Sequence, residues 1–207
     1  MEITREIAIR VRDIVDAGLV RGKGVQVPGQ MCVEAAVCAA LGLPHSDDPP
    51  CVDPVLRTLQ ISLNDWEGWA STKSRAAGMR RLALAQLGSA GAIDSADFIH
   101  LVIEMTVRRF LPIALRAAAS VNPVAEHKQA LEVASLQCEK ASSLKECEAA
   151  GEAGEAAGKT AGWAAGEAAG KAAQEKVYAD FCEGVVQVLI EMKAPGCQWL
   201  DLVEVQP

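Results

Sequence analysis

The chain has 207 residues; half of them are apolar, yet Trp, Tyr and Phe together number only eight, and the formal net charge is −7. This length allows one domain, or one domain with an appendage, and an aliphatic, Ala-rich interior favours packed helices over a β-sandwich. The excess negative charge lies in residues 121–207, with 7 Lys and Arg against 14 Asp and Glu, whereas residues 1–120 carry 13 of each. This balance argues against general nucleic-acid binding.

The cysteines and the apolar runs indicate the compartment. There are seven cysteines, an odd number, scattered along the chain, and the first residues lack the apolar core of a signal peptide. We therefore expect free thiols in a reduced cytoplasmic protein. No apolar run reaches the roughly 18 residues that a membrane span needs, so we expect no membrane partner.

The first third of the chain predicts three helices. Apolar residues recur at helical spacing over 2–17, and a basic, glycine-rich connector follows. A second helix is expected from Gln30 to Leu41, before a polar, turn-rich loop. Asp53 as N-cap and Pro54 at the first helical position predict a third helix over 54–63.

The middle of the chain continues in helices. Ser71 or Ser74 is expected to cap a helix that ends before Gly88. A long apolar helix is expected over 95–119, with a kink at Pro112, because the proline ring removes a donor and clashes one turn back. Asn122-Pro123 should then start another helix.

Residues 148–176 have a different composition. Gly-Glu-Ala-Ala-Gly-Lys occurs at 154–159 and again at 166–171, so that glycines recur every fourth residue. Each glycine inside a helix costs about 1 kcal/mol relative to alanine, but the glycines also form a smooth stripe that another helix can approach closely. We predict a helix here rather than a solvated low-complexity tract.

The remaining pattern is apolar and helical. An apolar helix is expected from Lys176 until Ala194-Pro195-Gly196, and the tail after it should dock back. The predicted fold is therefore all-α. A helical body covers 1–122, and a long Ala/Gly-rich arm with a C-terminal apolar helix covers 123–207, where it packs back or assembles as a homo-oligomer.

The stretch from Val25 to Asp48 concentrates reactive side chains near helix ends, and Cys32 is its candidate nucleophile. The start of a helix should lower the pKa of the Cys32 thiol, Gln30 could donate to an oxyanion, and His45 could act as base with Asp47 or Asp48 orienting it. However, a helix of about twelve residues spans roughly 18 Å and would separate Cys32 from His45, which leaves His100 as an alternative base. A buried structural thiol is the competing interpretation. Zinc is disfavoured, because five, six and five residues separate Cys32, Cys38, His45 and Cys51.

A pocket for an anionic small molecule is the alternative that we favour. Two irregular polar loops flank short helices, and the expected helix starts at Gln30, Pro54 and Ser74 would present free backbone donors to a phosphate. No metal or cofactor is expected. The expected ligand-binding residues are Lys23, Gln30, Glu34, His45, Asn64, Asp65, Trp66, Lys73 and Arg75.

Two blocks of the chain resemble a family of uncharacterised bacterial and phage proteins. One is Met31-Cys32-Val33-Glu34-Ala35-Ala36-Val37-Cys38 with the Leu41–His45 segment after it, and the other extends from Leu63 to Gly88. The resemblance implies a bacterial or phage origin and no particular activity. It suggests a binding protein that sequesters a host signalling nucleotide. A cysteine-dependent hydrolase and a purely structural or oligomerisation module are the alternatives.

Overall fold

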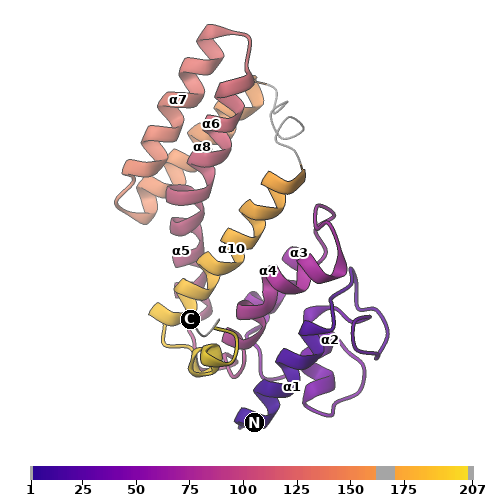
Figure 1. Ribbon diagram of the computed structural model, residues 1–207. Coiled ribbons are helices and arrows are strands. Elements are labelled where there is room, and N and C mark those ends of the chain that lie inside the picture. The colour runs from indigo at the N-terminus through magenta and orange to yellow at the C-terminus, as the bar shows by residue number, and fades with distance from the viewer. Residues whose placement is uncertain (1, 162–170, 205–207) are drawn as a thin grey trace. The chain divides into compact units, whose positions relative to one another are not determined.

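Helices are the only regular elements in the part of the chain that the computed structural model describes, residues 2–161 and 171–204, which confirms the predicted all-α fold. In chain order they are α1 (Arg5–Asp16), α2 (Val33–Ala40), α3 (Pro54–Asn64), α4 (Thr72–Ala85), α5 (Ser95–Met105), the π-helix η1 (Thr106–Phe110), α6 (Leu111–Val121), α7 (Ala125–Lys140), α8 (Leu144–Ala161), α10 (Lys171–Glu191) and the 3-10 helix η2 (Pro195–Leu202) (Figure 1). Side chains are described outside 158–174. None of the helices in these ranges is both long enough and apolar enough to cross a membrane.

The chain divides into two compact units, and the division differs from the predicted boundary at residue 122. The first unit consists of Met1–Phe98 and Glu175–Pro207, and the second consists of Ile99–Gln174. The C-terminal apolar helix therefore belongs with the N-terminal body. The sequence pattern could not show this, because periodicity identifies a helix without identifying its partner.

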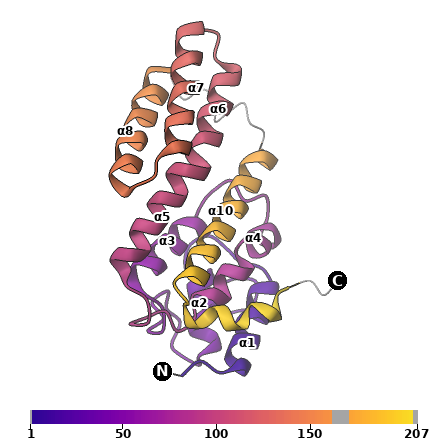
Figure 2. The same ribbon diagram turned by 90° about the vertical axis from the view of Figure 1, so that its left-hand side faces the viewer.

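The first unit is built around α1, α2 and α4. Helix α1 packs against both α2 and α4, and α2 also contacts α3 (Figure 2). Local signals set the helix starts as predicted: Asp53 accepts from the N–H groups of Val55 and Leu56, and Ser71 and Ser74 form a capping box at α4. The predicted start of α2 at Gln30 is wrong, because Met31 forms β-bridges with Leu19 and Gly24 and the helix begins at Val33.

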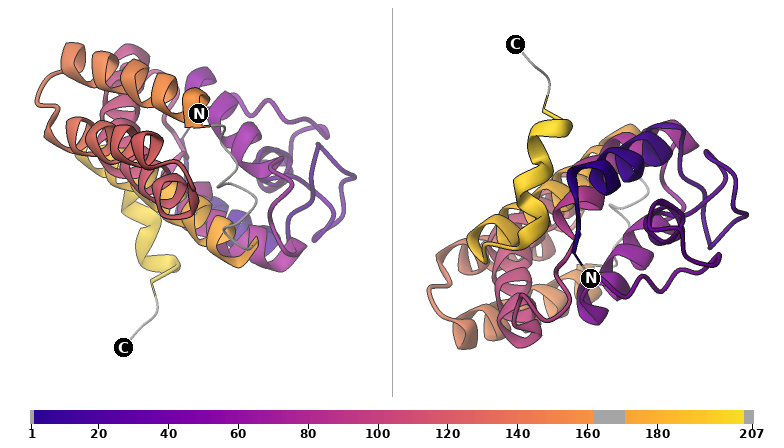
Figure 3. Two further views of the ribbon diagram at one scale, coloured as in Figure 1. Left: turned by 90° about the horizontal axis from the view of Figure 1, so that it is seen from above. Right: turned by 90° about the horizontal axis from the view of Figure 1, so that it is seen from below.

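The C-terminal segment docks on α4. Helix α10 is attached by its Tyr178 ring, which stacks on Trp66 at 3.6 Å between ring centroids, and by Glu183, which accepts from Arg81 of α4 at 2.9 Å. The tail then continues as η2, drawn in yellow in Figure 3, and packs against α4 and α1. The predicted docking of the tail is confirmed.

In the second unit α6, α7 and α8 lie side by side (Figures 1 and 2). Its core consists mainly of small side chains, with Leu115 and Leu131 as the fully buried large ones. The kink expected at Pro112 is a π-helical turn, η1, in which the Leu111 N–H donates to the Thr106 carbonyl one residue further back than in an α-helix. Proline has no N–H to donate, and the chain accommodates this loss by widening one turn of the helix.

Glycines of α8 allow close packing inside the second unit. A Cβ at Gly154 would lie 3.1 Å and 3.3 Å from side-chain atoms of Leu111 and Leu115, and a Cβ at Gly151 would lie 3.6 Å from Val107. At Gly154 the predicted smooth stripe contacts the chain's own helices, and Gly151 makes a similar contact one turn earlier. Gly162, Gly166 and Gly170 lie outside the described residues, as does Trp163, which was expected to pack against the body. Self-association through the arm therefore stays a prediction.

Candidate functional site

The connection between α1 and α2 folds back on itself at the start of α2. The Val20 N–H donates to the Met31 carbonyl at 3.0 Å, and the Val25 N–H donates to the Gln30 carbonyl at 2.8 Å. Gly24 has φ +68°, and a Cβ there would collide with the Gln30 carbonyl oxygen. The fold of this connection therefore requires glycine at position 24.

Asn64 and Asp65, at the end of α3, hold this connection against α2. The Asn64 Oδ1 accepts from the Val33 N–H at 3.2 Å, and its Nδ2 donates to the Val20 carbonyl at 2.8 Å. The Asp65 Oδ1 accepts from the Gly22 N–H at 2.8 Å. Both residues were predicted at the site, and both also have a structural role there.

The helix starts that we expected to bind an anion already have partners. At α2 the Cys32 Sγ accepts from the Ala35 N–H at 3.3 Å, while Asn64 takes the Val33 N–H. Asp53 caps α3, and Ser71 caps α4. A phosphate bound at any of these helix starts would have to displace the cap.

A small recess remains where these elements meet. It has a volume of about 30 Å³, which is room for one water molecule. It is lined by Gly22, Lys23, Cys32, Val33, Asp47, Ile61, Asn64 and Asp65. Four of the predicted site residues, Lys23, Cys32, Asn64 and Asp65, therefore do come together. The Asp47 carboxylate is half-buried and forms no hydrogen bond or ion pair within the described ranges.

Glu34 lies in the interior beside this recess. It is completely buried, and neither carboxyl oxygen has a hydrogen-bond partner among the described residues. Burial raises the pKa of Glu34 well above its usual value; the charge of Arg57 opposes this rise and that of Asp47 adds to it. Burial therefore favours the protonated form of the Glu34 carboxyl group in the folded protein.

The expected activation of Cys32 is wrong in direction. Burial raises the pKa of the Cys32 thiol to about 11, and this effect exceeds the lowering by backbone hydrogen bonds from Ala35 and Glu34. The thiol thus stays protonated at neutral pH and is a poor nucleophile. The helix start that should have stabilised a thiolate is itself buried, so the loss of hydration dominates.

Thiol reactivity should follow burial. Six of the seven cysteines are buried, and only Cys197 is partly exposed. In the native protein at pH 8 we expect one fast-reacting thiol toward Ellman's reagent, which a Cys197→Ser variant removes, and seven after denaturation. Fast labelling of Cys32 in the native C197S variant would contradict the buried role.

The other members of the predicted catalytic set are not arranged for catalysis. The His45 Nε2 lies 2.9 Å from the Gly24 carbonyl oxygen, a contact that attaches its loop to the α1–α2 connection. Gln30 is exposed on that connection and does not line the recess. His100 is exposed on α5. The geometry therefore offers Cys32 no hydrogen-bonded base.

Three predicted ligand-binding residues serve the packing of the first unit. The Lys73 ammonium donates to the Asp16 carbonyl at 2.8 Å, and the buried Arg75 donates to the Leu19 carbonyl at 2.9 Å. Trp66 stacks on α10. None of the three lines the recess.

Arg57 is the residue near the site that the sequence analysis missed. It lies on α3 and forms an ion pair with Asp48, and its charge acts on Glu34. Arg57, Ile61 and Asn64 share one face of a helix because they are spaced by four and three residues. That spacing, applied to the predicted site residue Asn64, could have identified Arg57.

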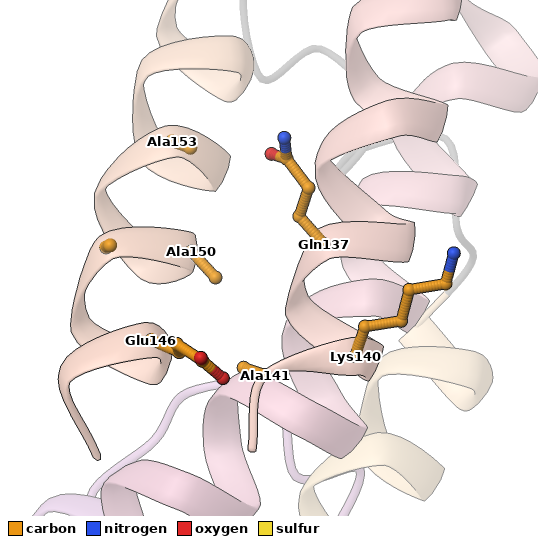
Figure 4. A pocket seen from close by; sticks show the side chains of 7 residues that line it. Gln137, Lys140, Ala141, Glu146, Ala150 and Ala153 are labelled. Atoms are coloured by element: carbon orange, nitrogen blue, oxygen red, sulfur yellow. The ribbon is translucent and has the colours of Figure 1, made fainter. Parts of the chain in front are cut away.

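The second unit carries two open grooves with less specific chemistry. The groove between α7 and α8 has a volume of about 510 Å³ and is lined mainly by alanines, with Gln137, Lys140 and Glu146 as its polar side chains (Figure 4). The Glu146 carboxylate already accepts from the N–H and hydroxyl of Ser142 at 2.7 Å. A groove of about 460 Å³ lies between α6 and α7. Small side chains explain the groove between α7 and α8, because alanines cannot fill the space between helices.

No family model, curated protein or solved structure matches the chain. The family suggested by the two sequence blocks therefore stays a prediction. Among the described residues there is also no group of three or more Cys, His, Asp or Glu side chains arranged to hold a metal ion.

Proposed function

We propose that this protein is a non-enzymatic binding protein and that its site is the recess beside Cys32. The recess is the place where four predicted site residues meet, and loops from three connections surround it. Binding without conversion is supported by the protonated thiol of Cys32 and by the engagement of His45 with Gly24. A role in holding a small molecule, as in sequestration, fits these features.

The ligand that fits the charge of the recess carries a primary ammonium group, not the phosphate expected from the sequence. An ammonium group is about as large as a water molecule and donates three hydrogen bonds, so it matches a volume of about 30 Å³. Asp47 and Asp65 supply carboxylates. The single observation that carries this proposal is the half-buried Asp47 carboxylate, which lines the recess and has no ion-pair partner within the described ranges.

Lys23 provides the test of this ligand class. Its side chain lines the recess from the α1–α2 connection and forms no hydrogen bond or ion pair within the described ranges. A ligand amine would meet the like charge of Lys23 beside the two carboxylates. An anionic ligand would instead require Lys23 as its counter-charge, so a single substitution distinguishes the two classes.

We expect a Lys23→Met variant to bind amines more tightly than the wild type. The gain should be about fivefold, since the interaction between two exposed charges contributes up to about 1 kcal/mol. Thermal shift and calorimetry with n-butylamine, putrescine and glucosamine measure it, with inorganic phosphate and ATP as the anionic arm.

An Asp47→Asn variant should lose at least about tenfold in amine affinity, because it removes a charged hydrogen-bond acceptor. The exposed Asp97→Asn variant serves as the matched control and should bind like the wild type. Stabilisation by phosphate or ATP that K23M abolishes would restore the anionic ligand. The absence of binding by every amine would reject the recess as an amine site.

A further inference from the structure

Arg57 lies between two carboxyl groups of opposite character. Asp48 is exposed, with 68% of its side chain accessible, and it forms an ion pair with Arg57, whose side chain is 26% accessible. Glu34 is completely buried and lacks hydrogen-bond partners among the described residues. Arg57 therefore pairs with the carboxylate that water already solvates, while the buried carboxyl group has no hydrogen-bond partner among the described residues.

The connection that carries Asp48 is also a wall of the recess. Within residues 44–50, His45 contacts the Gly24 carbonyl oxygen, Asp47 lines the recess and Asp48 holds Arg57. The ion pair between Asp48 and Arg57 attaches this connection to α3, and the release of Asp48 removes that attachment. Residues 46–48 could then move away from the recess, between the His45 contact and the buried Pro49.

We infer that Arg57 is a switch residue: it holds the 44–50 connection through Asp48 while Glu34 keeps its proton, and it turns to Glu34 when that proton leaves, which opens the recess. A buried carboxylate without a partner is strongly unfavourable, whereas one paired with a guanidinium is tolerated. The loss of an exposed ion pair with Asp48 costs at most about 1 kcal/mol. The balance therefore favours Glu34 once it is ionised.

The groups around Glu34 define this choice. Among the described residues, Arg57 is the cation whose charge acts on it, and Asp47 acts in the opposite sense. Cys32, Cys38 and Cys51 also interact electrostatically with Glu34, but burial keeps these three thiols protonated. Arg57 is thus the partner available to an ionised Glu34.

The direction in which pH changes the free energy of unfolding follows from the burial of Glu34. Well below pH 4.5, the ordinary pKa of a glutamate, Glu34 is protonated in both the folded and the unfolded chain and gives no pH dependence. As the pH rises further, the unfolded chain releases this proton while the folded protein retains it, so the free energy of unfolding falls until the folded-state pKa is passed. The connection should open over that same upper range of pH.

Nuclear magnetic resonance of the full chain tests the switch without any ligand, although what the switch gates rests on the proposed binding site. The Glu34 carboxyl ¹³C shift reports its ionisation, and ¹⁵N relaxation reports the order of amides 45–48. In the wild type we expect order parameters of these amides to fall from about 0.85 to below about 0.6 as Glu34 ionises. In Glu34→Gln they should stay high throughout, and in Asp48→Asn they should be low at every pH.

His45 is unchanged in all these variants, so its own titration cancels in the comparison. Asp97→Asn is the control for the loss of an exposed carboxylate and should follow the wild type. The switch is overturned if wild type and E34Q lose order in parallel, if Glu34 ionises while amides 45–48 stay ordered, or if D48N stays ordered at low pH. Failure of amine binding with a working switch would reject only the proposed ligand.

Discussion

Replacement of Gly196 by alanine is expected to lower the free energy of unfolding by roughly 3 kcal/mol or more, the upper range for a steric clash in a packed interior. A Cβ at this position would collide with the Leu84 carbonyl oxygen. It would also lie 2.6 Å from the Ala85 carbonyl oxygen and 2.7 Å from the Leu87 nitrogen. These are backbone atoms at the end of α4, which cannot move without loss of the helix end on which η2 docks.

Urea unfolding followed by circular dichroism measures the effect, and Gly91→Ala is the matched control. Gly91 has φ +70° and open space around its Cβ position, so alanine there carries only the backbone cost of about 1–2 kcal/mol. Gly196 has no such backbone requirement, so its cost comes from contact alone. A G196A variant that is as stable as G91A would show that η2 does not hold its position on α4.

Helix boundaries were predictable where a local signal sets them. Two adjacent residues, Asp53 and Pro54, define the start of α3, and the structure has the same cap and the same first residue. The start of α2 was predicted too early, because the residue that delays it, Met31, bonds to partners more than five residues away. Contacts of this kind are set by the tertiary fold and are absent from any periodicity.

The site was predictable in part for a similar reason. Lys23, Asn64 and Asp65 lie in connections or at helix ends, and polar side chains there converge where two loops meet. Arg75 and Lys73 carry the same kinds of groups, yet they donate to backbone carbonyls of the α1–α2 junction. Whether a cationic side chain donates to a backbone carbonyl or lines the recess depends on neighbours that only the fold supplies.

Glu34 shows the limit of reasoning from residue type. A glutamate in the first turn of a helix is ordinarily a solvated residue that favours the helix dipole. Here α2 is buried on nearly all sides, with Val33, Ala36 and Val37 fully inaccessible as well. The other residues of this helix are all apolar, which is typical of a helix that is buried on every side. That pattern was the signal in the sequence that the Glu34 carboxyl group would be buried as well.

Replacement of Asn64 by alanine should cost roughly 2–4 kcal/mol of stability and abolish the recess. The change leaves the Val33 N–H and the Val20 carbonyl without their partner, and each buried polar group left unsatisfied costs about 1–3 kcal/mol. The same bonds hold the α1–α2 connection at the recess. We therefore expect N64A to lose amine binding together with stability, as measured by urea unfolding and calorimetry.

Two further variants separate hydrogen bonding from shape at this position. Asn64→Asp preserves the volume and the acceptor for Val33, but it faces the Val20 carbonyl with an oxygen in place of a donor, so it should be at least as damaging as N64A. Asp65→Asn still offers an oxygen to the Gly22 N–H and should cost less than about 1 kcal/mol. If N64D were as stable as the wild type, the bond to Val20 would contribute nothing. The connection would then be held by Asp65 and by the β-bridges of Met31.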